Sequence, residues 1–150
     1  MFQELLGNLK ENSRIVVNNK EYEILSKTHY TTDNPEDYYV KCVLSDHNVL
    51  VVIPDELVYI GYIIDSNLYT IDDNNVLHFD GREFEYVTEG HQVVKSVEFG
   101  SDDIVEKGCN YQDYQTNDEK YIMSLAILEE NNERADILGT VIDVEDIILK

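Results

Sequence analysis

Short runs in which apolar and polar residues alternate occupy most of this chain, and this period of two is typical of half-buried β-strands. The residues at the N-terminus follow another period, because Phe2, Leu5, Leu6 and Leu9 recur at helical spacing. We therefore expect an all-β, mainly antiparallel protein with a short N-terminal helix. The expected strands lie at residues 15–26, 38–44, 49–53, 57–64, 76–87, 93–99, 120–128 and 138–144, and residues 100–118 read as a long polar stretch.

Two segments repeat one pattern of turn, base, acid, aromatic and acid. The first is Asn18-Asn19-Lys20-Glu21-Tyr22-Glu23, and the second is Asp80-Gly81-Arg82-Glu83-Phe84-Glu85. Asn-Asn and Asp-Gly both tolerate positive φ, so each segment predicts a tight β-hairpin. The repeat favours a duplicated β-meander, or two small-barrel halves, although any two acidic hairpins share some of this pattern.

The proposed duplication divides residues 1–150 into two similar halves, at about 13–64 and 76–149, that share one core in a single domain. Within this scheme Tyr39-Val40 corresponds to Tyr121-Ile122, and residues 62–64 correspond to 147–149. An approximate internal twofold axis is expected to relate the two halves.

The charge balance is strongly acidic, with 31 acidic residues against 11 basic ones and a formal net charge of -20. Acids are spread over both halves, which is typical of a solvated outer face rather than an acidic tail. Direct binding of nucleic acid or of anionic lipid needs clustered Lys and Arg, and this chain has no such cluster. The natural partner is a protein with a basic surface.

No apolar run approaches the roughly 20 residues of a transmembrane helix. No secretory signal is recognisable at the N-terminus. The two cysteines, Cys42 and Cys109, suit a reduced compartment, so we expect a cytoplasmic protein.

Candidate chemistry is sparse. His29, His47, His78 and His91 each stand alone, without a second ligand at metal-binding spacing, and Asp65-Ser66-Asn67 begins like a calcium loop but lacks its later ligands. Two sites for an enzyme can be defended from the residue types: Cys109, next to Gly108 and close to Lys107, and a paired-carboxylate site among Asp102, Asp103 and Glu106. We expect no cofactor, no metal and no catalytic residue.

Eleven tyrosines and no tryptophan give the chain an unusual aromatic content. Tyrosine suits protein interfaces because it is large, rigid and amphipathic, and it also suits half-buried strands. The tyrosines expected at a protein interface are Tyr59, Tyr62, Tyr111 and Tyr114.

Three segments carry a resemblance to a bacterial family of small acidic β domains: residues 16–24, the strand entry Asp37-Tyr38-Tyr39-Val40, and the closing residues 139–144. Members of that family are encoded near phage-shock-like and flotillin-like proteins. The resemblance implies a setting in a membrane-stress system and implies no catalytic mechanism.

Three function classes follow. The leading hypothesis is a non-enzymatic cytoplasmic binding or adaptor protein, in an envelope-stress system. The first alternative is an acidic mimic of DNA that inhibits a DNA-binding enzyme, for which a net charge of -20 on a small fold is suitable. The second alternative is an enzyme of unknown class.

Overall fold

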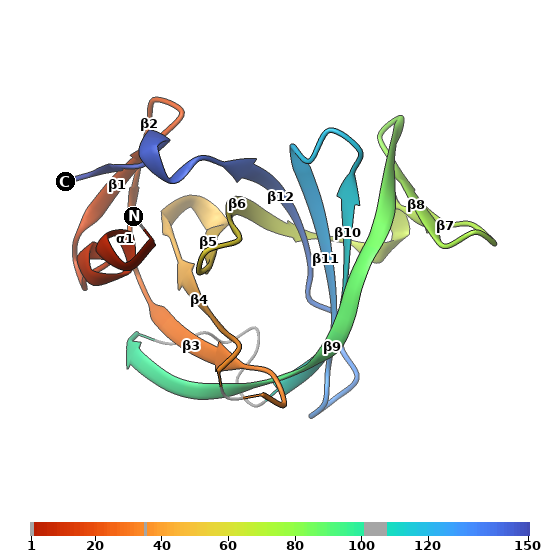
Figure 1. Ribbon diagram of the computed structural model, residues 1–150, viewed down its shortest axis with the longest axis horizontal. Coiled ribbons are helices and arrows are strands. Elements are labelled where there is room, and N and C mark those ends of the chain that lie inside the picture. Colours follow the sequence, from red (N-terminus) through yellow and green to blue (C-terminus); the bar gives the residue numbers. More distant parts are fainter. Residues whose placement is uncertain (1, 35, 101–107) are drawn as a thin grey trace.

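The computed structural model describes residues 2–34, 36–100 and 108–150, and these fold around a closed, antiparallel β-barrel of eight strands (Figure 1). In order around the barrel the strands are β3 (Lys27–Thr31), β4 (Tyr38–Val43), β5 (Asn48–Ile53), β6 (Leu57–Ile64), β12 (Asp136–Ile142), β11 (Tyr121–Leu128), β10 (Gly108–Thr116) and β9 (Arg82–Phe99). Pairing of β9 with both β10 and β3 closes the ring. The all-β prediction is confirmed.

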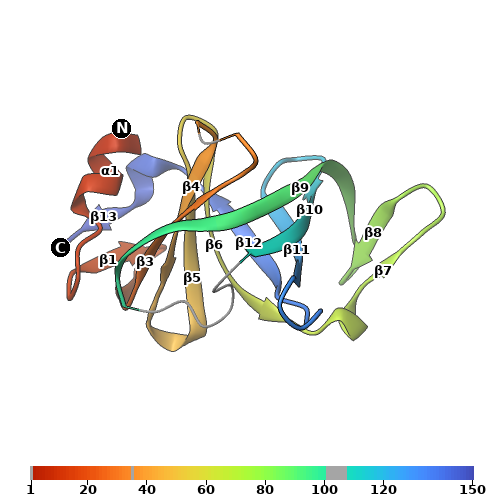
Figure 2. The same ribbon diagram turned by 90° about the horizontal axis from the view of Figure 1, so that it is seen from below.

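Two smaller units sit outside the barrel on opposite sides (Figure 2). One contains helix α1 (Phe2–Asn8) and a three-stranded sheet of β13 (Ile148–Leu149), β1 (Arg14–Val17) and β2 (Lys20–Glu23). The other is the hairpin of β7 (Thr70–Ile71) and β8 (Val76–Phe79), which extends the sheet beyond β9. Three 3-10 turns complete the chain: η1 (Ser45–His47), η2 (Ser66–Leu68) and η3 (Val144–Asp146). The predicted N-terminal helix is therefore present.

Helix α1 and the three-stranded sheet cover the outer face of β4, β5 and β6. Leu9 and Ile15 are fully buried there, in one cluster with Val40 and Leu50 of the barrel. Lys27 is also buried, and its Nζ donates a 2.6 Å hydrogen bond to the Leu6 carbonyl of α1. A cation at the C-terminal end of a helix is favourable, so this contact holds the short helix against the barrel.

The outer face of the opposite strands is covered by the second unit. Leu77 of β8 and Phe84 of β9 are completely buried in one cluster with Tyr114 and Met123. The barrel is thus sandwiched between two apolar clusters, and both use the outward-facing side chains of its strands. The inward-facing side chains are left to form the barrel interior.

The strand pairing of residues 14–71 recurs in residues 76–149. Ile15 pairs with Tyr22 in the first hairpin as Leu77 pairs with Phe84 in the second. Each half ends in a short strand that pairs with the hairpin of the other half. Strand β7 pairs with β8 of the second half, and β13 pairs with β1 of the first half. Gly61 of β6 pairs with Gly139 of β12 at the centre of this arrangement.

Several expected details differ in the structure. Residues 108–116 form strand β10 instead of belonging to a polar stretch, and residues 82–99 form one continuous strand instead of two. Counting paired residues outward from Gly61 and Gly139 makes Tyr39 the counterpart of Tyr111, not of Tyr121. The counterpart of β13 is β7, not residues 62–64. Alternation fixes the spacing within one strand, but which strand is the counterpart depends on pairing across the barrel.

Candidate functional site: the barrel cavity

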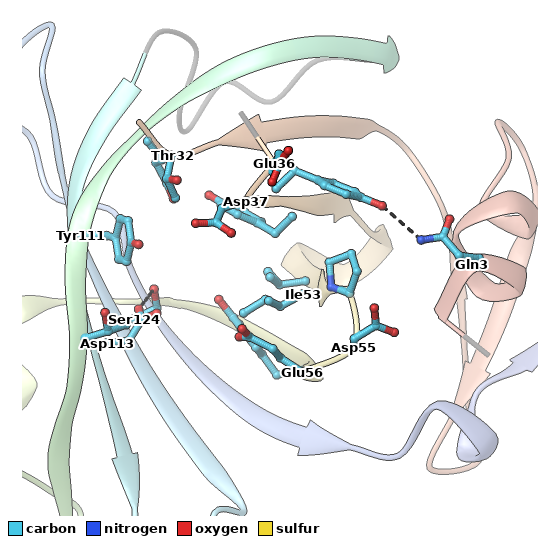
Figure 3. Close-up of a pocket in the computed structure, with 17 residues that line it drawn as sticks. Gln3, Thr32, Glu36, Asp37, Ile53, Asp55, Glu56, Tyr111, Asp113 and Ser124 are labelled. Carbon is cyan, nitrogen blue, oxygen red and sulfur yellow. Dashed lines mark hydrogen bonds between the residues drawn. The ribbon is translucent and has the colours of Figure 1, made fainter. Parts of the chain in front are cut away.

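The barrel encloses a cavity of about 490 Å³ that opens between the β3–β4 and β5–β6 connections (Figure 3). Pockets that bind small organic molecules usually have volumes of about 300–1,000 Å³. The lining residues from the first half are Gln3, Thr32, Glu36, Asp37, Tyr38, Tyr39, Val51, Ile53, Pro54, Asp55, Glu56 and Tyr59, and those from the second half are Thr88, Gln92, Tyr111, Asp113 and Ser124.

Strand alternation brings these side chains to the interior. On β11, Met123 and Leu125 point outward into the apolar cluster under the β7–β8 hairpin, so Ser124 between them points inward. On β10, Tyr114 is outward and Asp113 is inward, next to a register shift in the pairing with β9. On β10 and β11 the interior therefore receives polar side chains, whereas β5 and β12 contribute apolar ones such as Val51 and Ile137.

Asp113 is the carboxylate inside the cavity. Its Oδ1 accepts a 2.7 Å hydrogen bond from Ser124 Oγ, the contact drawn in Figure 3. Burial raises the pKa of Asp113 to about 6, and the Ser124 hydrogen bond opposes that rise. At neutral pH the group is mostly ionised, and it lies in surroundings that disfavour its charge.

Tyrosines form much of the inner wall. Tyr39 stacks on Tyr30, with ring centroids 4.8 Å apart and an interplanar angle of 9°. Burial raises the pKa of Tyr39, Tyr59 and Tyr111, and the negative charge of Asp113 acts in the same direction on each of them. Ser124 acts in the opposite direction on the pKa of Tyr59. The phenols stay neutral hydrogen-bonding groups at physiological pH.

A small recess of about 30 Å³ adjoins the cavity, and Lys41 lines it. Lys41 is 3% exposed, and its Nζ lies 5.9 Å from the centroid of the Tyr30 ring. Among the described residues that line the cavity and the recess, an acid, Asp113 of β10, and a base, Lys41 of β4, therefore lie on different strands of the interior.

Cys109 lies in the same interior region, completely buried in a cluster with Tyr30. Gln92 Nε2 donates a 2.9 Å hydrogen bond to its Sγ, and burial raises the pKa of the Cys109 thiol to about 11. A nucleophilic cysteine needs a lowered pKa, so Cys109 does not have the chemistry considered for it from the sequence. The other enzyme candidates, Asp102, Asp103 and Glu106, lie outside the described residues.

Four exposed acids surround the cavity opening. Glu36 and Asp37 come from the β3–β4 connection, and Asp55 and Glu56 come from the β5–β6 turn. Among the described residues that line the cavity there is no Lys, Arg or His. The opening is therefore negatively charged, and Asp113 adds a further carboxylate inside.

The four predicted interface tyrosines have different environments. Tyr59 and Tyr111 line the cavity, and Tyr114 is 1% exposed, with its hydroxyl 2.6 Å from Asn75 Oδ1. Tyr62 alone of the four is well exposed, at 49%. Tyr59 and Tyr114 therefore offer little surface to a protein partner in this structure, and an interface role stays a prediction for Tyr62 and for the half-buried Tyr111.

Sequence reasoning missed Asp113, Ser124 and Tyr39 as site residues. Asp113 lies in the segment 100–118, which the sequence pattern indicates to be a polar stretch, so nothing near it along the chain predicts that its carboxylate is enclosed. A usable signal was present, because Tyr111 and Asp113 have the two-residue spacing of side chains on one face of a strand.

The histidines lie away from the cavity. His29 contacts Glu98, His78 contacts Asp72 at 2.8 Å, and His91 contacts both Asp33 and Glu129. No group of three or more metal-ligating side chains is present in residues 2–34, 36–100 and 108–150. Asp65, which begins the calcium-like segment, accepts a 2.8 Å hydrogen bond from the Asn67 backbone N–H within η2.

Comparisons with models of protein families, with curated proteins and with solved structures find no match to this chain. The resemblance to a membrane-stress family stays a prediction. Within the part of the chain that the structure describes, no helix has the length and apolar character needed to span a membrane.

Proposed function

We propose that this protein is a non-enzymatic binding protein, and that its binding site for a small organic molecule is the barrel cavity. The observation that carries the proposal is a cavity of about 490 Å³ into which Asp113, Ser124 and several tyrosines converge. A concave, partly aromatic site with a few placed polar groups is the usual form of a ligand pocket.

The arrangement of the core supports this proposal. Many large apolar side chains of the barrel strands point outward into the two covering clusters. Val51, Ile122 and Ile137 form an inner apolar cluster, and this cluster fills only part of the interior, because the cavity remains beside it. Tyr39, Tyr59 and Tyr111 leave space between them while keeping rigid aromatic surface on the wall. A protein that used the interior only as a core would be expected to fill it, because interiors are normally close-packed.

Occupation of the cavity can be tested with a neutral fluorescent probe, N-phenyl-naphthylamine, which becomes bright in apolar sites. Thr88 lines the cavity and pairs with Asp113 across β9 and β10, so a Thr88→Trp side chain will take up cavity space. We expect the wild-type protein to bind the probe and Thr88→Trp to lose at least tenfold in affinity.

The matched control is Thr140→Trp. Thr140 is exposed on β12 and pairs with Ile60, which belongs to the outer cluster, so this variant adds the same side chain outside the cavity. Absence of probe binding, or equal binding by both variants, would overturn the proposal.

The partner and setting stay predictions. A protein with a basic surface, and an envelope-stress system in the cytoplasm, are compatible with a negatively charged ligand-binding protein. The acidic-decoy hypothesis rests on the net charge of -20.

A further inference from the structure

The described lining of the cavity is unbalanced in charge. It contains five carboxylates, on Glu36, Asp37, Asp55, Glu56 and Asp113, and no basic side chain among the described residues. Carboxylates around a low-dielectric opening concentrate the field inside it and raise the local concentration of cations. A negative ligand entering this opening would be repelled at the entrance and again at Asp113.

Asp113 accepts fewer hydrogen bonds from the described residues than an ionised carboxylate can accept. An ionised carboxylate has about four lone-pair sites, and among the described side chains the hydrogen bond to Asp113 comes from Ser124. Burying a charge without an opposite charge is costly, and a charge-assisted hydrogen bond from a cation offsets that cost. The site is thus suited to a ligand that brings its own positive donor.

The tyrosine wall favours the same ligand. Tyr39, Tyr59 and Tyr111 all line the cavity that Asp113 enters, and Ser124, which donates to Asp113, lines it as well. Aromatic rings attract organic cations through their negative faces and also cover the apolar part of such a molecule. Lys41 lines the adjoining recess rather than the main cavity, so the positive end of a ligand belongs at Asp113 and away from Lys41.

We infer that the cavity binds an organic cation: an ammonium group on a compact aromatic or apolar body, with the ammonium paired to the Asp113 carboxylate. This inference rests on the proposed function and adds the chemical class of the ligand. The body of the ligand packs among Tyr39, Tyr59 and Tyr111, and the four acids at the opening speed its entry.

The test uses three probes of similar shape and different charge: naphthylethylamine, naphthylethanol and naphthylacetate. We expect the amine to bind the wild-type protein at least tenfold more tightly than the alcohol, and the carboxylate to bind more weakly than either. Isothermal titration calorimetry at pH 7.5 measures all three affinities. An alcohol or a carboxylate that binds as tightly as the amine overturns the inference.

The variant Asp113→Asn tests whether the affinity for the amine comes from an ion pair with Asp113 or from the overall negative charge of the protein. The amide keeps the shape and can still accept the Ser124 hydrogen bond, so we expect at least a tenfold loss of amine affinity and unchanged alcohol affinity. Asp73→Asn removes one exposed acid from the β7–β8 turn and serves as the matched control, with affinities close to wild type. Equal amine binding by the two variants would contradict the assignment to Asp113.

The two proposals fail in different ways. If N-phenyl-naphthylamine and the alcohol bind in a manner sensitive to Thr88→Trp but the amine has no advantage, only the cation inference is lost. If no probe of any charge binds, or none is sensitive to Thr88→Trp, the cavity is not the binding site and both proposals are overturned.

Discussion

The two halves of the barrel share one pattern of strand pairing and carry different side chains at corresponding places. In the first half Lys41 pairs with Val51, which pairs with Tyr59, and in the second half Asp113 pairs with Ser124, which pairs with Ile137. Counting from the central pair of glycines makes Lys41 the counterpart of Asp113. Corresponding backbone positions thus carry a basic side chain in the first half and an acidic side chain in the second half.

This difference shows that the backbone pairing and the interior chemistry are specified separately. Outward-facing positions keep the apolar clusters intact in both halves, but inward-facing positions diverge. Ser124 in place of a larger residue leaves space beside Asp113, whereas Lys41 occupies the recess next to Tyr30. The space of the cavity therefore comes from the inward side chains, and its negative charge comes from Asp113 and from the acids of the two connections, not from the pairing pattern.

The largest effect is expected at a place where the two halves differ in burial. Val40 is completely buried under the N-terminal unit, and its counterpart by strand register, Gln112, is exposed. Val40→Asp buries an unpaired charge and is expected to cost about 4 kcal/mol or more, enough to prevent folding. Gln112→Asp places an exposed charge opposite Glu89 and is expected to cost only about 1 kcal/mol. Urea denaturation followed by circular dichroism measures both, and similar losses would contradict the assigned faces.

The second prediction concerns the central glycines. A Cβ at Gly61 would lie 2.3 Å from the backbone oxygen of Leu138, whereas a Cβ at Gly139 would meet side-chain atoms first, Tyr59 Cδ2 at 2.5 Å and Ile122 Cγ2 at 2.9 Å. We expect Gly61→Ala to cost about 3 kcal/mol and Gly139→Ala about 1–2 kcal/mol, because overpacking costs less where a side chain can shift. Gly139→Ala is also expected to weaken probe binding through Tyr59. A larger loss at Gly139 than at Gly61 would be inconsistent with this contact geometry.

The third prediction uses the pKa of Asp113, which burial raises to about 6. An unfolded aspartic acid ionises near pH 4, so the unfolded chain loses this proton first as the pH rises. The contribution of Asp113 to the free energy of unfolding is therefore most favourable below about pH 4 and declines as the pH approaches 6. Above pH 6 it stays constant and unfavourable.

Asp113→Asn removes that penalty in the ligand-free protein. Asp113 faces an open cavity, which reduces the penalty, so we expect a gain of about 1–2 kcal/mol at pH 8 and almost none at pH 4. Asp73→Asn is the comparison variant. Urea titrations at the two pH values decide the outcome, and a loss of stability at pH 8 would show that Asp113 is stabilising instead.

The smallest effect is expected from Tyr114→Phe. Its hydroxyl donates a 2.6 Å hydrogen bond to Asn75 Oδ1, and the ring is buried in the cluster under the β7–β8 hairpin. Removal of the hydroxyl keeps the packing and is expected to cost about 1 kcal/mol. The counterpart by register is Cys42, which is buried in the other cluster. Asn75→Ala should cost a similar amount, and the double variant should show that the two losses are not additive.

The local sequence pattern was sufficient to predict the hairpins and the N-terminal helix, but it was not sufficient to predict which residues line the cavity. Alternation around Tyr22 and Phe84 predicted both hairpins, and the spacing of Leu5 and Leu9 predicted the helix, because these signals depend only on neighbours along the chain. The spacing of Tyr111 and Asp113 indicates a shared strand face, but it does not indicate that this face is enclosed, because that depends on β9 and β11 pairing with β10 and on the β7–β8 hairpin covering its other face.

The sequence by itself determined that this protein is all-β with an N-terminal helix, strongly acidic, and organised around two similar hairpins. Only the tertiary structure decided that β9 closes a barrel against β3 and that the two outer units cover opposite sides of it. Alternation divides each strand into two faces, but closure determines which face is enclosed. One face of each of β10 and β11 packs outward against the β7–β8 hairpin, and the other face places Asp113, Ser124 and Tyr111 around the cavity, beside the inner apolar cluster.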